Sequence, residues 1–426
     1  MSKKRSNVIF LLHASLAAFG TYFCMYAFRK PFSVATFDGL AFMGVDYKIL
    51  LVIAQVLGYA LSKFVGIKVI SELTPNRRLL YLISLIIFAE ISLVLFAWVP
   101  APYNIPLMFL NGFPLGMIWG IVFSYIEGRR FTDILGVVLS ASFIVSSGVV
   151  KSVGLYVMQF WGVGEFWMPS VTGALFFVPL LLCSFLLQRV PPPTTEDIAN
   201  RTERIPMTAR DRKDLVKKFL FPLLLIIVFY TFLTAFRDFR DNFARELWDS
   251  IGYRGDVSVF STSEIIIAIV VLLIIGAIFY IKDNFKALLT YHVLLILGTV
   301  VLGGSTLMFQ VGILDPFVWM VCTGFGLYIC YVPFNCLFFD RFIATFKVKG
   351  NSGFLIYIAD AFGYVGSVLV LLYKNFGQAS LSWLNFFVYG TYAVAFIGIC
   401  STLILFAHFA SRSKAEQLNK ELDYGQ

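Results

Sequence analysis

Long apolar runs separated by short polar segments fill almost the whole chain. A bilayer has a hydrocarbon core ~30 Å thick, and about 20 apolar residues in a helix are needed to cross it. By this measure the pattern predicts twelve helices, near residues 8–36, 47–70, 79–99, 104–126, 133–160, 166–188, 218–246, 258–281, 286–309, 315–340, 350–374 and 382–410. Runs of this length exclude a transmembrane β-barrel. The predicted fold class is an all-α membrane protein.

One long polar stretch divides these helices into two groups of six. It runs through residues 189–218, contains Pro191, Pro192 and Pro193, and then becomes strongly basic. We therefore expect an N-terminal six-helix half (1–189), a cytoplasmic linker (190–217), a C-terminal six-helix half (218–411) and a cytoplasmic tail (412–426). Secondary transporters are commonly built from two such halves, related by an axis along the membrane normal.

Composition supports a membrane protein and excludes a soluble globular domain. Hydrophobic residues make up 59% of the 426 residues and charged residues 14%, whereas soluble domains have ~45–50% and ~25%. The six cysteines all lie in apolar segments without the spacing of metal ligands, so we interpret them as small buried hydrophobic residues. No metal site or cofactor is expected.

The net charge of +9 is explained by where the basic residues lie. If the N-terminus is cytoplasmic, the inner loops and tail collect Arg77, Arg78, Arg129, Arg130, Lys282, Lys286, Arg341, Lys347, Lys349, Arg412 and Lys414. The outer loops hold only Lys48, Arg245, Arg254 and Lys374. This is the positive-inside pattern, which predicts that both termini are cytoplasmic in a multi-pass protein of the cell (inner) membrane. The basic linker then contacts water and the lipid bilayer, and no nucleic-acid partner is expected.

Two arginines follow apolar runs at corresponding places in the two halves. Arg29 ends the run opened by Val8, and Arg237 ends the run opened by Phe219. A charge inside hydrocarbon costs at least ~2.5–3.5 kcal/mol, so such residues usually face a protein interior and have a function. Spacings of three, four and seven would place Tyr22, Tyr26 and Arg29 on one helical face, where the guanidinium could bind an anion bidentately. The alternative is that Arg29 extends to the outer membrane surface.

Lys63 is a further cation within an apolar run, four residues after Tyr59. It is a candidate for the same basic cavity. The alternative is that its long side chain extends to the headgroups at the cytoplasmic end of the helix.

The seventh predicted helix ends in a run of opposite charges: Arg237, Asp238, Arg240, Asp241, Arg245 and Glu246. Arg237 with Asp241, and Asp241 with Arg245, are four residues apart, which predicts ion pairs along one helix. Asp238, Arg240 and Asp241 are therefore candidate gate residues, while Arg237 is the candidate for binding the solute.

Two carboxylates in later helices could couple transport to protons. Glu264 and Asp360 lie in the eighth and eleventh predicted helices. Burial favours the neutral form of a carboxyl group, as proton coupling requires. The alternative is that each is an ion-pair partner of a basic residue in the same cavity.

Several motifs resemble the organophosphate:phosphate antiporter family of the major facilitator superfamily. The segment from Tyr22 to Phe32 resembles its helix 1 stretch with Arg-Lys-x-Phe, and Tyr59-Ala-Leu-Ser-Lys63-Phe resembles its helix 2 motif. Glycine-rich segments beginning at Asn111 and Phe362 resemble its helices 4 and 11. The resemblance implies a twelve-helix transporter in which Arg29, Arg237 and Lys63 contact a substrate phosphate and Tyr22 and Tyr26 orient it.

The chain departs from this family in two places. Val145 stands where the family has a histidine in helix 5, and the charges around Arg237 are more crowded than in the family's helix 7. Both departures are consistent with a solute or a gate that differs from those of the family.

The leading hypothesis is a secondary transporter of a small anionic solute, such as phosphate or an organic phosphate exchanged for phosphate, acting as a monomer by alternating access. One alternative is a proton-coupled transporter of another solute, and a second is a transporter-like ligand sensor. An enzyme is disfavoured because the sequence shows no nucleophile–base pair.

Overall fold

The computed structural model describes residues 3–71, 73–126, 131–193, 209–278, 280–346, 352–378 and 380–424. Arg129, Arg130, Lys347 and Lys349, on which part of the predicted orientation depends, lie outside these residues. Within them, twelve helices are long and apolar enough to cross a membrane, as the hydrophobic pattern predicts. They are α1 (Lys3–Met25), α2 (Tyr47–Ser71), α3 (Arg78–Trp98), α4 (Ile105–Ile126), α5 (Thr132–Trp161), α6 (Met168–Gln188), α9 (Leu220–Asn242), α11 (Ser258–Ile278), α12 (Asn284–Gln310), α13 (Pro316–Cys336), α15 (Ser352–Leu372) and α16 (Trp383–Tyr424).

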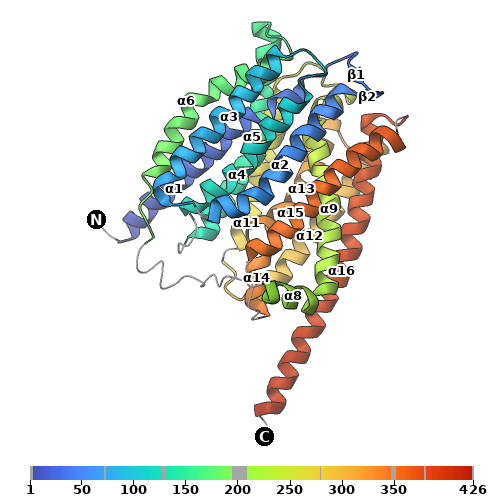
Figure 1. Cartoon of the computed structure of the whole chain (residues 1–426). Helices are drawn as coiled ribbons and strands as arrows, with labels where there is room; N and C mark the ends of the chain where they lie inside the picture. Colours follow the sequence, from blue (N-terminus) through green and yellow to red (C-terminus); the bar gives the residue numbers. More distant parts are fainter. Residues whose placement is uncertain are drawn as a thin grey trace.

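Short elements connect or extend these helices. A two-stranded antiparallel hairpin, β1 (Ala41–Phe42) and β2 (Val45–Asp46), joins the end of the first span to α2. The remaining elements are η1 (Tyr26–Phe28), η2 (Pro31–Val34), η3 (Pro75–Arg77), α8 (Ala209–Lys218), α10 (Ala244–Ser250), α14 (Phe338–Thr345) and the π-helical turn η4 (Tyr373–Gly377). An even number of spans places both termini at one end of the bundle. We call this the termini end, and we call the opposite end, which carries β1 and β2, the hairpin end (Figure 1).

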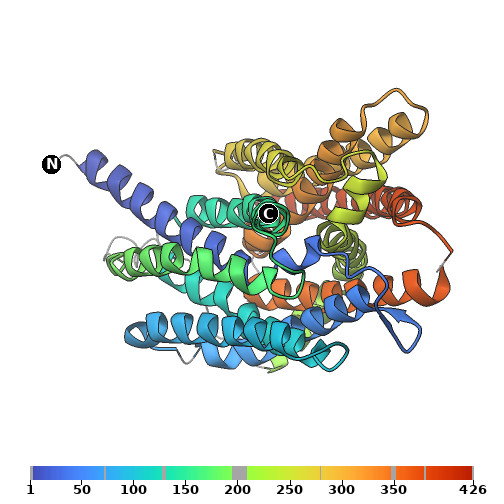
Figure 2. The same ribbon diagram turned by 90° about the horizontal axis from the view of Figure 1, so that it is seen from above.

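The helices form the two halves that the long polar stretch predicts. In the first half α1 packs on α6 and α2 packs on α4, while in the second α9 packs on α15 and α12 packs on α13 and α16. Figure 1 shows the blue-to-green half beside the yellow-to-red half. The largest contacts between the halves are those of α5, which packs along α11, and of α2, which lies beside α15, as the view in Figure 2 also shows.

A glycine permits the close approach of α5 to α11. A Cβ added at Gly148 would lie 2.8 Å from Cβ of Glu264 and would also meet the carbonyl oxygen of Phe260. Small residues let helix backbones approach closely in membrane proteins. The absent side chain at Gly148 therefore allows the two halves to touch.

Three predicted helix boundaries were wrong. The first helix ends at Met25 rather than near residue 36, because the chain tightens into η1 and then meets Pro31, which has no N–H for a helical bond. The seventh spanning helix ends at Asn242, and the residues after Phe243 form the separate helix α10. The last spanning helix, α16, continues past residue 410 to Tyr424. Most of the short helix α8 lies within the predicted linker.

Candidate functional site

A small polar cavity lies between the two halves. We call it the central cavity; it is lined by Tyr26, Arg29, Lys30, Phe143, Arg237, Asp238, Asp241 and Tyr328. The first four residues belong to the N-terminal half and the last four to the C-terminal half. Its volume of about 10 Å³ is room for about one water molecule. The conformation seen here is therefore closed around the cavity, and a larger solute requires the halves to move apart.

Arg29 enters this cavity where the first span is broken. The carbonyl groups freed by the break are bound by side chains of neighbouring helices: Gln55 donates to the carbonyl of Arg29 (2.9 Å) and Asn111 donates to that of Phe28 (3.0 Å). Gln55 also donates to Asn111 (2.8 Å), so α2 and α4 together hold the broken segment. These bonds fix the backbone from which the guanidinium projects.

Aromatic rings flank the Arg29 guanidinium, which forms no ion pair with a carboxylate of the described residues, although Asp238 lines the same cavity. Its Cζ lies 3.8 Å from the ring centroid of Tyr59 and 5.9 Å from that of Tyr26. Nε is buried, with no hydrogen-bond partner among the described residues. A buried unpaired donor carries an energetic cost. Arg29 is thus a cation that still has a hydrogen-bond donor available for an anionic ligand.

Arg237 has a similar aromatic neighbour but also a counter-ion. Its Cζ lies 3.8 Å from the ring centroid of Tyr331, and Nη2 donates to Oδ1 of Asp238 (2.6 Å). The other oxygen of Asp238 accepts a hydrogen bond from Ser367 on α15 (2.9 Å). An anion that binds Arg237 must therefore compete with Asp238.

Asp241 is the centre of a charge cluster that joins the halves. Its carboxylate pairs with Lys30 after η1 and with Lys151 of α5, and it accepts a hydrogen bond from Ser147. Lys30 also donates to Asn242 (3.0 Å). One carboxylate of the C-terminal half thereby binds two cations of the N-terminal half.

A second cross-half pair lies nearer the hairpin end. Lys48 of α2 pairs with Glu246 of α10 and donates to the carbonyl of Ser33 (2.7 Å). Burial raises the pKa of Glu246 above its ordinary value, and the Lys48 ammonium limits that rise. Together with the Asp241 cluster, this pair holds the hairpin ends of the two halves together.

Lys63 lies outside the central cavity, in a neighbouring one. That cavity, of about 30 Å³, is lined by Ala60, Lys63, Phe64, Tyr357, Ala361 and Tyr364. Lys63 Nζ lies 3.9 Å from Asp360 across the interface, and Asp360 also accepts a hydrogen bond from Tyr230 (2.6 Å). Lys63 is thus directed toward α15, in the other half, and its side chain is only 15% exposed.

Two further candidates form an ion pair within the C-terminal half. Arg240 Nη1 donates to Glu264 (2.5 Å), and Nη2 donates to the carbonyl of Met320 (3.1 Å). Glu264 and Asp360 therefore both pair with basic residues. This is the arrangement expected if they are ion-pair partners, the alternative to proton coupling. Tyr22 does not line the central cavity; it is buried behind Tyr26, with ring centroids 5.5 Å apart.

The predicted ion pairs along the seventh helix were wrong. Arg237 pairs with its neighbour Asp238, and Asp241 pairs across the interface. Arg245 pairs with Asp249, because α9 ends at Asn242 and Arg245 belongs to α10. The break after Asn242 explains the Arg245 error, whereas Arg237 and Asp241 share α9 and instead bind other partners.

Sequence reasoning did not assign several residues of this region to their partners. Lys151 was recognisable as a lysine within an apolar run, but nothing in the sequence assigns it to Asp241. Tyr59 opens the motif that contains Lys63, but nothing in the sequence places its ring on Arg29. Tyr331, which stacks on Arg237, is one of 20 tyrosines and carries no distinguishing spacing.

The fold defines the class of protein to which this chain belongs. The crystal structure of a D-xylose-proton symporter is similar, with a TM-score of 0.58 and 16% sequence identity, over 92% of this chain and 96% of that one. The chain is accordingly a polytopic membrane protein with the twelve-helix fold of the major facilitator superfamily. A family of unknown function (DUF5690) matches residues 31–412, and the chain belongs to that family. No curated protein matches it.

Proposed function

We propose that this protein is a secondary transporter of a small anionic solute, phosphate or an organic phosphate, that works by alternating access between its two halves. The observation that carries the proposal is the position of Arg29 and Arg237. They come from corresponding spans of the two halves and line one cavity at the interface. Guanidinium groups match the oxygens of phosphate and carboxylate bidentately.

An anion between the two arginines would contact both halves at once. Arg29 is available for it, while Arg237 must exchange Asp238 for the solute. The cavity is closed toward the hairpin end by the Asp241 cluster and the Lys48–Glu246 pair. We infer that the solute reaches the cavity from the termini end when the halves move apart there, and that release at the other side requires both cross-half pairs to open. With both termini cytoplasmic, as the positive-inside pattern predicts, the termini end is the inner side.

Proton coupling is the second candidate, because a carboxylate paired with a cation releases that cation when it takes up a proton. Asp238 binds Arg237 and Asp360 lies beside Lys63. A proton taken up by either carboxylate would weaken its pair and free the cation for a solute. The similar solved structure is that of a proton symporter by its title. This candidate predicts a solute-driven pH change in liposomes that is reduced in Asp360→Asn.

The decisive experiment is uptake of labelled phosphate into phosphate-loaded proteoliposomes. We expect exchange by the native chain and none by Arg29→Ala or Arg237→Ala. Arg254→Ala is the matched control, because Arg254 is an exposed arginine on the hairpin-end loop. Unchanged exchange in Arg29→Ala, with normal reconstitution, would reject the arginine pair as the binding site. Solute binding without exchange in the native chain would instead indicate a sensor.

A further inference from the structure

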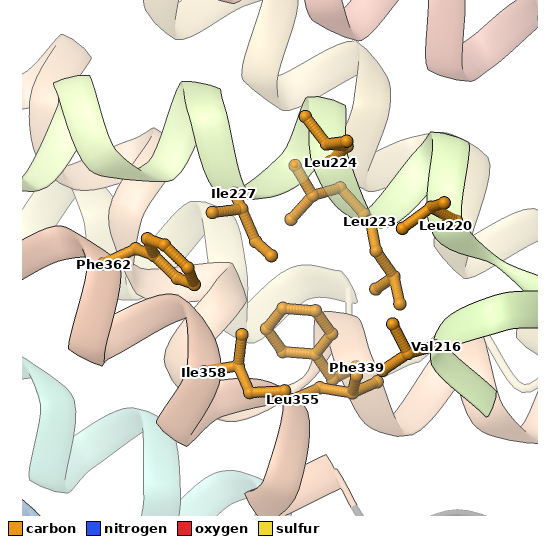
Figure 3. A pocket seen from close by; sticks show the side chains of 10 residues that line it. Val216, Leu220, Leu223, Leu224, Ile227, Phe339, Leu355, Ile358 and Phe362 are labelled. Carbon is orange, nitrogen blue, oxygen red and sulfur yellow. The ribbon is translucent and has the colours of Figure 1, made fainter. Parts of the chain in front are cut away.

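An apolar cavity opens in the C-terminal half at the termini end, away from the central cavity. It has a volume of about 300 Å³, and its lining is entirely apolar, from α8, α9, α14 and α15. Figure 3 shows Leu223 and Ile227 of α9 facing Phe339 of α14 and Ile358 of α15. Pockets that hold small molecules start at about this size, ~300–1,000 Å³. Without a polar group in its lining, the cavity suits a hydrocarbon chain and not a polar solute.

The mouth of this cavity faces the region where lipid chains lie. Leu220 and Leu224 on α9 are each 54% exposed, and Phe362 on α15 is 53% exposed. The exposed face of α15 continues from Phe362 to Val365 and Leu369, at spacings of three and four. In a spanning helix such an apolar exposed stripe contacts acyl chains. The cavity therefore opens between two lipid-facing helices.

A short basic helix borders the same cavity. Val216 of α8 lines it, and Leu215 of the same helix is buried. The ten residues of α8 include five basic and two acidic side chains, which leaves a net charge of +3. Arg212, Lys213 and the pair Lys217 and Lys218 are exposed. A basic amphipathic helix at the end of a membrane span is the arrangement that binds anionic headgroups.

We propose that this site binds one anionic phospholipid of the surrounding leaflet. One acyl chain occupies the cavity between α9, α14 and α15, and the headgroup phosphate is bound by Lys217 and Lys218. Two observations of different kind lead to the same ligand. The cavity accepts only hydrocarbon, and the helix at its border supplies the positive charge that a phosphate diester needs. The assignment is independent of the transported solute, because none of these residues lines the central cavity.

Native mass spectrometry of the full chain tests the assignment. The protein is released from detergent that holds equal amounts of phosphatidylglycerol and phosphatidylcholine with identical acyl chains. We expect bound phosphatidylglycerol to exceed bound phosphatidylcholine several-fold. The double variant Lys217→Gln/Lys218→Gln should lose this preference, and Ile358→Trp, which fills the cavity, should lose bound lipid of both kinds.

Matched controls separate a specific site from general effects. Lys282→Gln/Lys286→Gln removes two exposed lysines at the same end of the molecule, and Val300→Trp adds the same bulk at an exposed position of α12. Both should keep the native lipid pattern. Equal retention of the two lipids by the native chain would overturn the proposal. So would native lipid binding in both test variants, or a lipid-free dimer, which would show that a second copy covers the cavity.

Discussion

Arg29 and Arg237 stack on tyrosines in the same way, one in each half of the molecule. Each guanidinium carbon lies 3.8 Å from a ring centroid, that of Tyr59 for Arg29 and that of Tyr331 for Arg237. The two sites differ in one respect, since Arg237 forms an ion pair with Asp238 whereas Arg29 forms none with a described carboxylate. The pair is therefore symmetric in position and asymmetric in charge.

The stacked geometry makes lysine a poor substitute for either arginine. A lysine keeps the charge but loses the planar fork and the stacking on tyrosine. Hydrogen bonds to charged groups contribute about 1.5–3 kcal/mol, so we expect Arg29→Lys to reduce kcat/KM for exchange by about 10- to 100-fold. Transport kinetics in proteoliposomes measure this. Native activity in Arg29→Lys would show that Arg29 supplies charge alone.

Asp238 competes with the solute for Arg237, so its removal should strengthen binding. We expect Asp238→Asn to lower KM several-fold, because the guanidinium no longer has to leave a carboxylate before it binds the anion. Asp249→Asn is the control, since Asp249 pairs with Arg245 on α10, outside the central cavity. A raised KM in Asp238→Asn would mean that Asp238 orients Arg237 and does not inhibit it.

Asp241 should control the closure of the hairpin end. Asp241→Asn leaves Lys30 and Lys151 buried without their shared carboxylate, and breaking a buried pair in this way costs about 3–5 kcal/mol. A cost of this size shifts a two-state equilibrium strongly, here toward a conformation with the halves apart at this end.

Spin labels at exposed Met43 and Arg254 measure that shift. These residues lie on hairpin-end loops of different halves. We expect a population at longer distance in Asp241→Asn and none in the control Asp249→Asn. An unchanged distance distribution would show that the Asp241 cluster does not hold this end closed.

The sequence was sufficient for the fold because the length of an apolar run reports directly on whether a helix can cross a bilayer. The same logic located Arg29, Lys63 and Arg237, since a charge in such a run needs a protein environment. All three lie at the interface between the halves. Their binding roles stay predictions.

The apolar pattern of the sequence does not reveal which residues pair across the interface between the halves. Asp241 and Lys151 are 90 residues apart, and their contact depends on how α5 meets α9 in three dimensions. Spacing suggested Arg237 as a partner for Asp241, and both do lie on α9, but Asp241 pairs with Lys30 and Lys151 of the other half. Pro31 did signal the break in the first span, but the hydrogen bonds from Gln55 and Asn111 that support the broken segment depend on the packing of α2 and α4.

The contact at Gly148 gives a test of how closely the halves must approach. A Cβ there would lie 2.8 Å from Glu264, nearer than real side chains come, and would also meet the Phe260 carbonyl. We expect Gly148→Ala to destabilise this conformation by about 1–3 kcal/mol, the usual cost of overpacking, and to lower the Tm in detergent. Gly164→Ala is the matched control, because no atom lies within 4 Å of a Cβ at that position. Since Glu264 binds Arg240, the same change should also disturb that ion pair and reduce transport. Equal Tm values for the two variants would show that α5 and α11 separate at this point without cost.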